Sequence, residues 1–230
     1  MRQIAILSIF LLLAACGEQV DSKAAASSNK MTCIAGGQKL AGTGEPEVGL
    51  ASFGIQGDTI TGFGLGLNIE HAGKVHEVSS ALMPLPMKTG IYYFPSLTEP
   101  GMTLASYKLR TADRDLLRDY NGGTYSQQYS AIENDPEAKL KIQVDKMEVS
   151  DAAQPGFKRV HAVGHFEFNA AALPAASPSD ACVKDGIVRS IKSASAGKQQ
   201  LPKFDAAVCG AEKTHVQCDF DVVADLVKQQ

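Results

Sequence analysis

The chain has 230 residues, of which 44% are apolar and 20% are charged, and its formal net charge is −3. This balance is that of a globular protein, and it excludes a chain that is disordered throughout. A slight negative charge also argues against nucleic-acid binding, which needs a basic field to neutralise phosphates, so we expect no nucleic-acid partner.

The first element in chain order is a secretion signal. Residues 1–3 include one positive charge, and residues 4–13 are apolar apart from Ser8. An apolar run of about ten residues is too short to span a membrane and fits the hydrophobic region of a signal peptide. The run ends in Leu13-Ala14-Ala15-Cys16, where small residues precede a cysteine.

This order of charge, apolar run and L-A-A-C resembles the lipobox of bacterial lipoproteins. The resemblance implies cleavage before Cys16, a diacylglycerol on its sulfur and a further acyl chain on the new amino group. Three acyl chains exceed the two lipid signals that stable anchoring requires. Gly17, and not an aspartate, follows the cysteine, which in lipoproteins of double-membraned bacteria implies sorting to the outer membrane. An ordinary signal peptide is the alternative.

A tether and one domain follow the signal. Gly17 to Lys30 is small, polar and free of aromatic residues, and a flexible chain of this length has a root-mean-square reach of roughly 20 Å. We expect a signal peptide at residues 1–15, the lipidated cysteine with its tether at 16–30, and a single β-rich domain at 31–230. No apolar run after the signal reaches the roughly 18 residues that a membrane-spanning helix needs.

Alternation of apolar and polar residues dominates the domain and predicts about eight or nine short strands. The clearest strands are expected at residues 48–55, 59–70, 74–82, 91–94, 103–110, 138–149, 159–168 and 216–222. Tight turns are expected at Gln56-Gly57-Asp58 and Ala72-Gly73. The apolar phase flips between Val144 and Met147, which predicts a β-bulge near Asp145. The fold class is therefore mainly β, an antiparallel β-sandwich or a barrel-like domain.

One short helix is expected at residues 113–121, because Leu116, Leu117 and Tyr120 have helical spacing and Gly122 follows them. Residues 170–180 and 193–203 are rich in Ala, Ser and Pro, and we interpret them as loops within the domain.

Four cysteines remain after Cys16, and an even number in an exported chain predicts two disulfides. The candidates are Cys33, Cys182, Cys209 and Cys218. Three pairings are open, of which we prefer Cys209 with Cys218 and Cys33 with Cys182. Zinc is the competing interpretation, but the chain contains no C-x-x-C pair.

Three glycines, Gly62, Gly64 and Gly66, share one face of the strand expected at 59–70. Glycine weakens a strand and often marks the close approach of another group. The preferred interpretation is a side chain from a neighbouring strand, such as an aromatic ring. The functional interpretation is an apolar partner or ligand.

The sequence shows no specific catalytic or metal-binding motif, so we expect neither a catalytic residue nor a metal or cofactor. His165 and Glu167 lie about 7 Å apart on one strand face and could share an ion. No third ligand is identifiable, and a solvated polar face is the preferred interpretation.

We therefore expect a non-enzymatic lipoprotein at the outer membrane, with its domain in the periplasm, that binds a protein or an envelope component. The alternative is a carrier of an apolar ligand, in which the strands close around a cavity and the glycine face makes room for the ligand. A third hypothesis is an envelope hydrolase, which would need a nucleophile, a base and an orienting group in one cleft.

Overall fold

The structure is a computed structural model that describes residues 29–52, 55–56, 59–60, 63–81, 88–94, 105–121, 140–172, 178–195, 205 and 207–227. The expected signal peptide, the lipidation site at Cys16 and most of the tether lie outside these residues, as do Gly57, Asp58 and Gly62. In the described part of the chain, no helix is long and apolar enough to cross a membrane.

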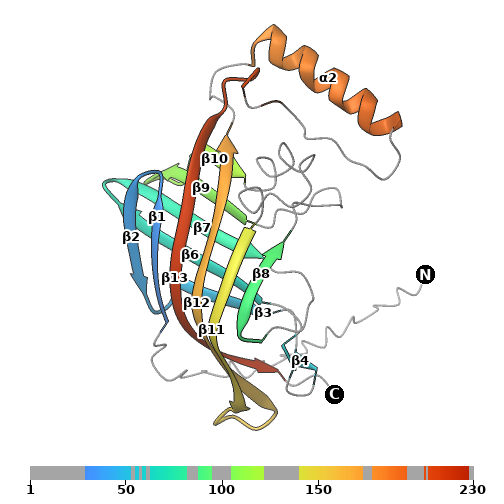
Figure 1. Ribbon diagram of the computed structural model, residues 1–230. Coiled ribbons are helices and arrows are strands. Elements are labelled where there is room, and N and C mark those ends of the chain that lie inside the picture. Colours follow the sequence, from blue (N-terminus) through green and yellow to red (C-terminus); the bar gives the residue numbers. More distant parts are fainter. Residues whose placement is uncertain are drawn as a thin grey trace, which may run out of the picture.

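Strands make up most of the described chain (Figure 1). The elements are β1 (Lys30–Ala35), β2 (Gln38–Thr43), β3 (Val48–Ser52), β4 (Ile55–Gln56), β5 (Thr59–Ile60), β6 (Phe63–His71), β7 (Lys74–Ala81), β8 (Gly90–Phe94), β9 (Ala105–Thr111), β10 (Leu116–Asn121), β11 (Leu140–Asp151), β12 (Phe157–Ala172), α2 (Asp180–Ser195) and β13 (Glu212–Val227). The predicted antiparallel, mainly β class is confirmed.

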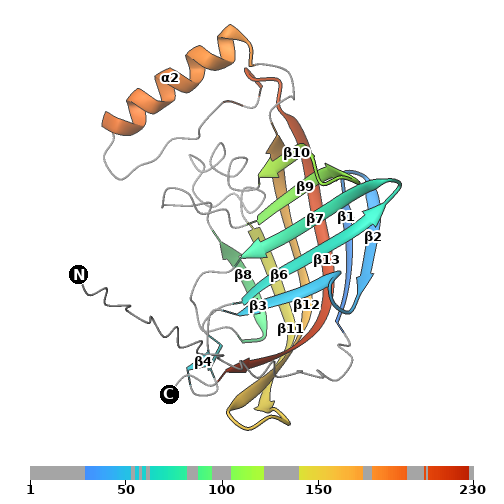
Figure 2. The same ribbon diagram turned by 180° about the vertical axis from the view of Figure 1, so that it is seen from behind.

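Eleven of these strands form one antiparallel sheet in the order β2-β1-β13-β12-β10-β9-β7-β6-β3, with β11 pairing both β12 and β8. β10 and β11 both pair with β12, β10 at Ala171 and β11 between Lys158 and Glu167. Beyond β12 the sheet divides and folds over, so that β9, β7, β6 and β3 cross the strands of the other layer (Figure 2). The end strands β2 and β3 are not hydrogen-bonded to each other. The domain is therefore sandwich-like and not a closed barrel.

The core lies between the two layers. In β12 the alternate residues Val160, Ala162, Phe166 and Phe168 are almost fully buried, and β13 contributes Val216, Cys218, Phe220 and Val222 in the same way. Leu65 and Leu67 of β6 and Val78 of β7 bury their side chains from the opposite layer. Alternation with period two puts every second side chain on the core face, and the strands predicted at 159–168 and 216–222 are confirmed.

The predicted bulge is also confirmed. The register of β11 against β12 shifts between Val144 and Lys146, which moves the inward-facing set of β11 by one residue. Gly164 of β12 lies opposite Val144, where an added Cβ would collide with the Gln143 carbonyl oxygen. A side chain at residue 164 would therefore displace the strand.

The predicted hairpin at Ala72-Gly73 is confirmed, with φ angles of 52° and 69° that suit a tight turn between β6 and β7. β4 pairs with β5 through Ile55 and Ile60, and the expected turn residues between them lie outside the described residues. β1 and β2 were not expected from the sequence.

The helix expected at residues 113–121 is wrong, because residues 116–121 form β10, which pairs with β9. Asp115 N donates to Thr111 Oγ1 at 3.0 Å, and Arg114 takes a φ of 70°, so a tight turn reverses the chain before Leu116. Leu116 and Leu117 are 52% and 37% exposed. The apparent helical face was therefore not a packing face.

Among the described residues the helix is instead α2, in a region whose two flanks were interpreted as loops. Ser179 Oγ accepts a hydrogen bond of 3.2 Å from Cys182 N, which caps the helix, and Asp180 follows in the first turn. A serine at this position satisfies one of the free N–H groups of a helix start. The expected loops at 170–180 and 193–203 are thus wrong at residues 170–172, which end β12, and at residues 180 and 193–195, which belong to α2.

Two disulfides are confirmed, but the preferred pairing is wrong. Cys33 pairs with Cys218, with Cα atoms 4.0 Å apart, and Cys182 pairs with Cys209 at 4.6 Å. The reason is the sheet order, since β1 lies beside β13 and sets Cys33 directly opposite Cys218. Disulfides persist in oxidising compartments, and this framework indicates an extracytoplasmic location.

Candidate functional site

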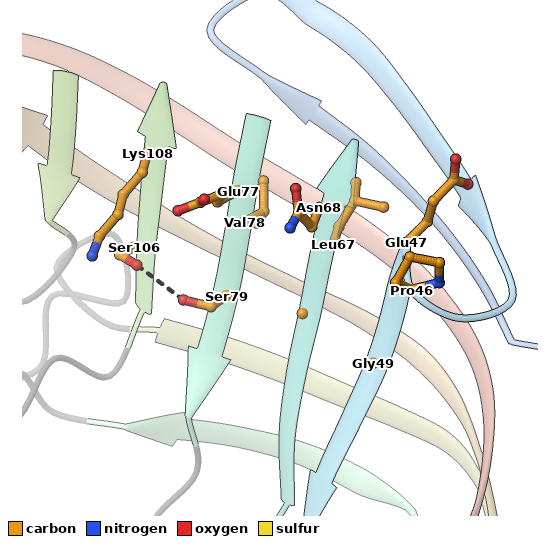
Figure 3. Close-up of a pocket in the computed structure, with 11 residues that line it drawn as sticks. Pro46, Glu47, Gly49, Leu67, Asn68, Glu77, Val78, Ser79, Ser106 and Lys108 are labelled. Atoms are coloured by element: carbon orange, nitrogen blue, oxygen red, sulfur yellow. Dashed lines mark hydrogen bonds between the residues drawn. The ribbon is translucent and has the colours of Figure 1, made fainter. Parts of the chain in front are cut away.

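A groove opens on the outer face of the layer formed by β3, β6, β7 and β9, where the sequence predicts a contact face (Figure 3). Its volume is about 300 Å³. It is lined by Pro46, Glu47, Gly49, Gly66, Leu67, Asn68, Glu77, Val78, Ser79, Ser106 and Lys108. The groove crosses the strands, so its floor and walls come from successive cross-strand rows of residues.

The floor is a row of very small side chains. Gly49 of β3 lies opposite Gly66 of β6, Gly66 opposite Ser79 of β7, and Ser79 opposite Ser106 of β9. The two serine hydroxyls are joined by a hydrogen bond of 2.9 Å. Across four strands this row presents only hydrogen atoms and hydroxymethyl groups, which leaves the backbone accessible from outside.

A polar wall borders the floor. Asn68, Glu77 and Lys108 form the next outward-facing row, again opposite one another on β6, β7 and β9. Glu77 Oε1 forms ion pairs with Arg110 Nε at 3.0 Å and Arg114 Nη1 at 3.7 Å. Lys108 forms no hydrogen bond or ion pair with the side chains that the structure describes. The wall therefore offers one ammonium group and a partly compensated carboxylate to an occupant.

The three predicted contact glycines differ in their surroundings. Gly64 is buried, and Gly62 lies outside the described residues. At Gly66 an added Cβ would meet only the Val78 carbonyl oxygen, at 4.0 Å, and at Gly49 it would meet no atom within 4 Å. The covering side chain that we preferred for this face is therefore not over Gly66, where there is room for an outside group.

A buried polar cluster lies on the core side of the same layer, and the sequence reasoning missed it. His76 Nδ1 and Tyr107 OH are joined by a hydrogen bond of 2.9 Å, and the Tyr107 ring stacks on Tyr120 with centroids 5.3 Å apart. Tyr120 OH donates to Glu212 at 2.9 Å. The inward phase of His76 and Tyr107 in their strands is the only sequence signal that could have indicated this cluster.

Burial controls the protonation of this cluster. Burial, followed by the nearby His71, lowers the pKa of His76, and its Nε2 has no hydrogen-bond partner among the described residues. Burial, together with the hydrogen bond to Glu212, raises the pKa of Tyr120 to about 12. His76 is 2% exposed, so the cluster braces the interior and does not present a base to a substrate.

The described residues on the polar face of β12 form an ion pair around Glu167. Lys141 Nζ donates to Glu167 at 2.7 Å and holds the pKa of that carboxyl below its usual value, and His215 Nε2 lies 3.6 Å from the same carboxylate. In the described ranges no three His, Cys, Asp or Glu side chains are placed to hold a metal ion. Glu167 instead takes part in an ion pair between β11 and β12.

No protein-family model, curated protein or solved structure matches this chain. The function must therefore be inferred from the chain itself. Two features of the described surface require an explanation beyond the stability of the fold, namely the groove over Gly49 and Gly66 and the unusual setting of α2.

Proposed function

We propose that this chain is a lipid-anchored, extracytoplasmic and non-enzymatic binding module, and that its groove receives a protein or an envelope component. The observation that carries the proposal is the open floor over Gly49 and Gly66. The Leu13-Ala14-Ala15-Cys16 motif supports an anchor at the outer membrane with the domain in the periplasm, and the two disulfides support the oxidising compartment.

Glycine at positions 49 and 66 lowers the stability of the sheet, and a binding partner that contacts the backbone there would explain why both are present. Glycine in a strand is less stable than alanine by roughly 0.5–1 kcal/mol at each position. The fold does not need glycine at these two positions, since a Cβ atom would fit at both residues. An outside group that approaches the backbone closely accounts for both glycines, because a side chain at either residue would hold that group away.

The lining favours a polar occupant over an apolar one. Lys108 and Glu77 contribute charges, and Asn68 and the Ser79–Ser106 pair contribute donors and acceptors. The carrier alternative gains no support from the described residues, because the buried side chains between the layers belong to one hydrophobic cluster. A flat segment of a protein or a hydroxyl-rich envelope polymer suits the open floor and the polar wall.

A substitution that is harmless to the fold tests the groove. Gly66→Val should leave thermal stability unchanged or slightly higher, since valine favours strands and has room there. In intact cells the same variant should lose chemical crosslinking to the partner that the wild type captures. Gln217→Val is the matched control, because Gln217 is exposed on β13 in the other layer. Undiminished capture of the same partner by Gly66→Val would reject the groove as the binding site.

The anchor has its own test. Cys16→Ser should prevent lipidation, because no thiol remains for the diacylglycerol, and the protein should remain unprocessed or become soluble. Membrane fractionation after a high-salt wash measures this. Normal retention of the variant in the membrane fraction would reject the lipoprotein prediction and leave the groove proposal intact.

A further inference from the structure

α2 stands apart from the sandwich at the tip of its longest hairpin. The ladder between β12 and β13 ends at the pair Ala172 and Glu212, so residues 173–211 form an insertion between the two strands. Figures 1 and 2 both show α2 beyond the end of the sheet, where it covers neither layer. The helix therefore contributes little to the core that stabilises the domain.

One face of α2 is fastened to the turn that precedes β13. Cys182 forms the disulfide with Cys209, and Asp185 accepts hydrogen bonds from Arg189 Nε at 2.7 Å and from Asp205 N at 2.8 Å. Arg189 Nη2 also reaches Asp205 at 3.1 Å. The spacing of residues 182, 185 and 189 places all three side chains on the same face of the helix.

The opposite face is apolar and exposed. Val183, Ile187 and Ile191 follow one another at four-residue intervals and are 49%, 55% and 61% exposed. At about 100° per residue this stripe lies on roughly the opposite side of the helix from the fastened face. The stripe therefore points away from the only part of the described chain that holds α2.

Local stability does not explain the stripe. Valine and isoleucine are weaker helix formers than alanine, and an isolated helix of this length is marginal in water. A disulfide and an ion-pair network hold the helix in place without covering its apolar side. Such pre-ordering lowers the entropic cost of recognition by an outside partner. We propose that α2 is a recognition helix whose Val183, Ile187 and Ile191 stripe docks into an apolar groove on another protein.

The position of α2 favours a protein over the anchoring membrane. β1 pairs with β13 so that Lys30 lies opposite Asp221, whereas α2 adjoins the Glu212 end of the same strand. Nine strand residues separate those two points, a distance of about 30 Å. With the N-terminal end of the domain toward the membrane, where the proposed anchor at Cys16 would hold it, α2 lies at the far end of β13.

The residue composition of α2 also favours a protein partner over a membrane. Helices that lie on membranes carry many Lys and Arg on the polar face and Trp, Phe or Leu on the other. The polar face of α2 instead uses Asp185 and Arg189 to fasten the helix, and its stripe has only Val and Ile. Lys184 adjoins the stripe, is exposed, and has no ion pair in the described part of the chain. The partner groove should therefore place a carboxylate beside Lys184.

Site-specific photocrosslinking of the full-length protein in intact cells tests this inference. A benzophenone amino acid at position 187 should give one protein adduct of defined mass. Ile191→Asp in the same chain should abolish the adduct, and Lys184→Glu should reduce its yield several-fold. Ile34→Asp and Lys39→Glu are the matched controls, since they make the same changes at exposed residues of β1 and β2 and should leave the yield unchanged.

Each other outcome would overturn the inference. A phospholipid adduct would assign the stripe to the membrane, an adduct between two copies would assign it to self-association, and an adduct within one chain would show that the protein covers its own helix. Absence of any adduct, or a protein adduct that Ile191→Asp does not change, would also contradict it. Ile191→Asp should leave the thermal midpoint of the domain unchanged, and a clear fall would show that the stripe is packed.

Discussion

The sandwich and the α2 insertion hold their apolar side chains in opposite ways. In the sandwich, Phe166, Leu67 and Ile142 are almost completely buried between two layers of strands. In the insertion, Val183, Ile187 and Ile191 are about half exposed, and the helix is held by a disulfide and two acidic residues around Arg189. Packing therefore stabilises the first region, and covalent and ionic links stabilise the second.

The two disulfides follow the same division. Cys33 and Cys218 join neighbouring strands inside a core that is already closed, and both are 0% exposed. Cys182 and Cys209 close a loop wholly within the insertion, where few apolar contacts are available. One bridge therefore reinforces the fold, whereas the other replaces a core and keeps α2 ordered.

The largest contrast should come from removing one large apolar side chain in each region. Phe166→Ala should lower the free energy of unfolding by about 3–5 kcal/mol, because it leaves a cavity beside Phe168 and Phe220. Ile187→Ala should change it by less than about 0.5 kcal/mol, as surface substitutions usually do. Urea unfolding of both variants measures the difference. Similar losses in the two variants would show that α2 is packed as the core is.

The disulfides should show the next largest contrast. The double variant Cys33→Ala with Cys218→Ala should destabilise the sandwich by about 2–5 kcal/mol, since the bridge constrains residues 185 positions apart in the unfolded chain. Cys182→Ala with Cys209→Ala should leave the main unfolding transition nearly unchanged. Without the bridge the loop between these residues is unconstrained both before and after the sandwich unfolds. The same variant should expose α2 to limited proteolysis. Resistance of α2 to the protease would mean that packing holds it after all.

The sequence predicts the parts of this fold that local alternation determines. β12 and β13 keep one apolar phase over many residues, and the flip between Val144 and Met147 located the bulge. The helix prediction for residues 113–121 failed because a few apolar residues fit a helix and a strand equally well. The turn formed by Thr111 and Asp115 decided between the two. α2 was missed, although Val183, Ile187 and Ile191 have the spacing of an amphipathic helix, because the Ala, Ser and Pro residues on both flanks indicated loops.

The features that could not be predicted depend on which strands are neighbours in the sheet. The pairing of Cys33 with Cys218 depends on β1 lying beside β13, and no local pattern encodes that neighbour. The groove shows the same limit, since Gly66 could be recognised as unusual within its own strand. Gly49, Ser79 and Ser106 join Gly66 only through the registers of three strand pairs. Sequence reasoning therefore found one residue of the floor and could not assemble the row.

The smallest predicted effect is a pH dependence that arises in the sandwich and not in the insertion. Burial lowers the pKa of His76 below the ordinary value of 6.5, with the charges of His71 and Lys74 acting in the same direction. The unfolded chain then binds this proton more readily than the folded chain, so stability falls as the pH drops below about 6.5. Each pH unit between the two pKa values should cost about 1.4 kcal/mol, and the loss should stop below the folded value.

His76→Gln should remove this dependence, because glutamine does not titrate, while His215→Gln at an exposed residue of β13 is the matched control. Thermal unfolding of the three proteins between pH 7.5 and 5 (roughly the range that histidine titration covers) measures the slopes. A slope in His76→Gln equal to that of the wild type would contradict the assignment to His76. The insertion should behave differently, since Cys182, Asp185 and Arg189 hold α2 without a histidine. Protease resistance of α2 should therefore stay constant over the range in which the sandwich loses stability.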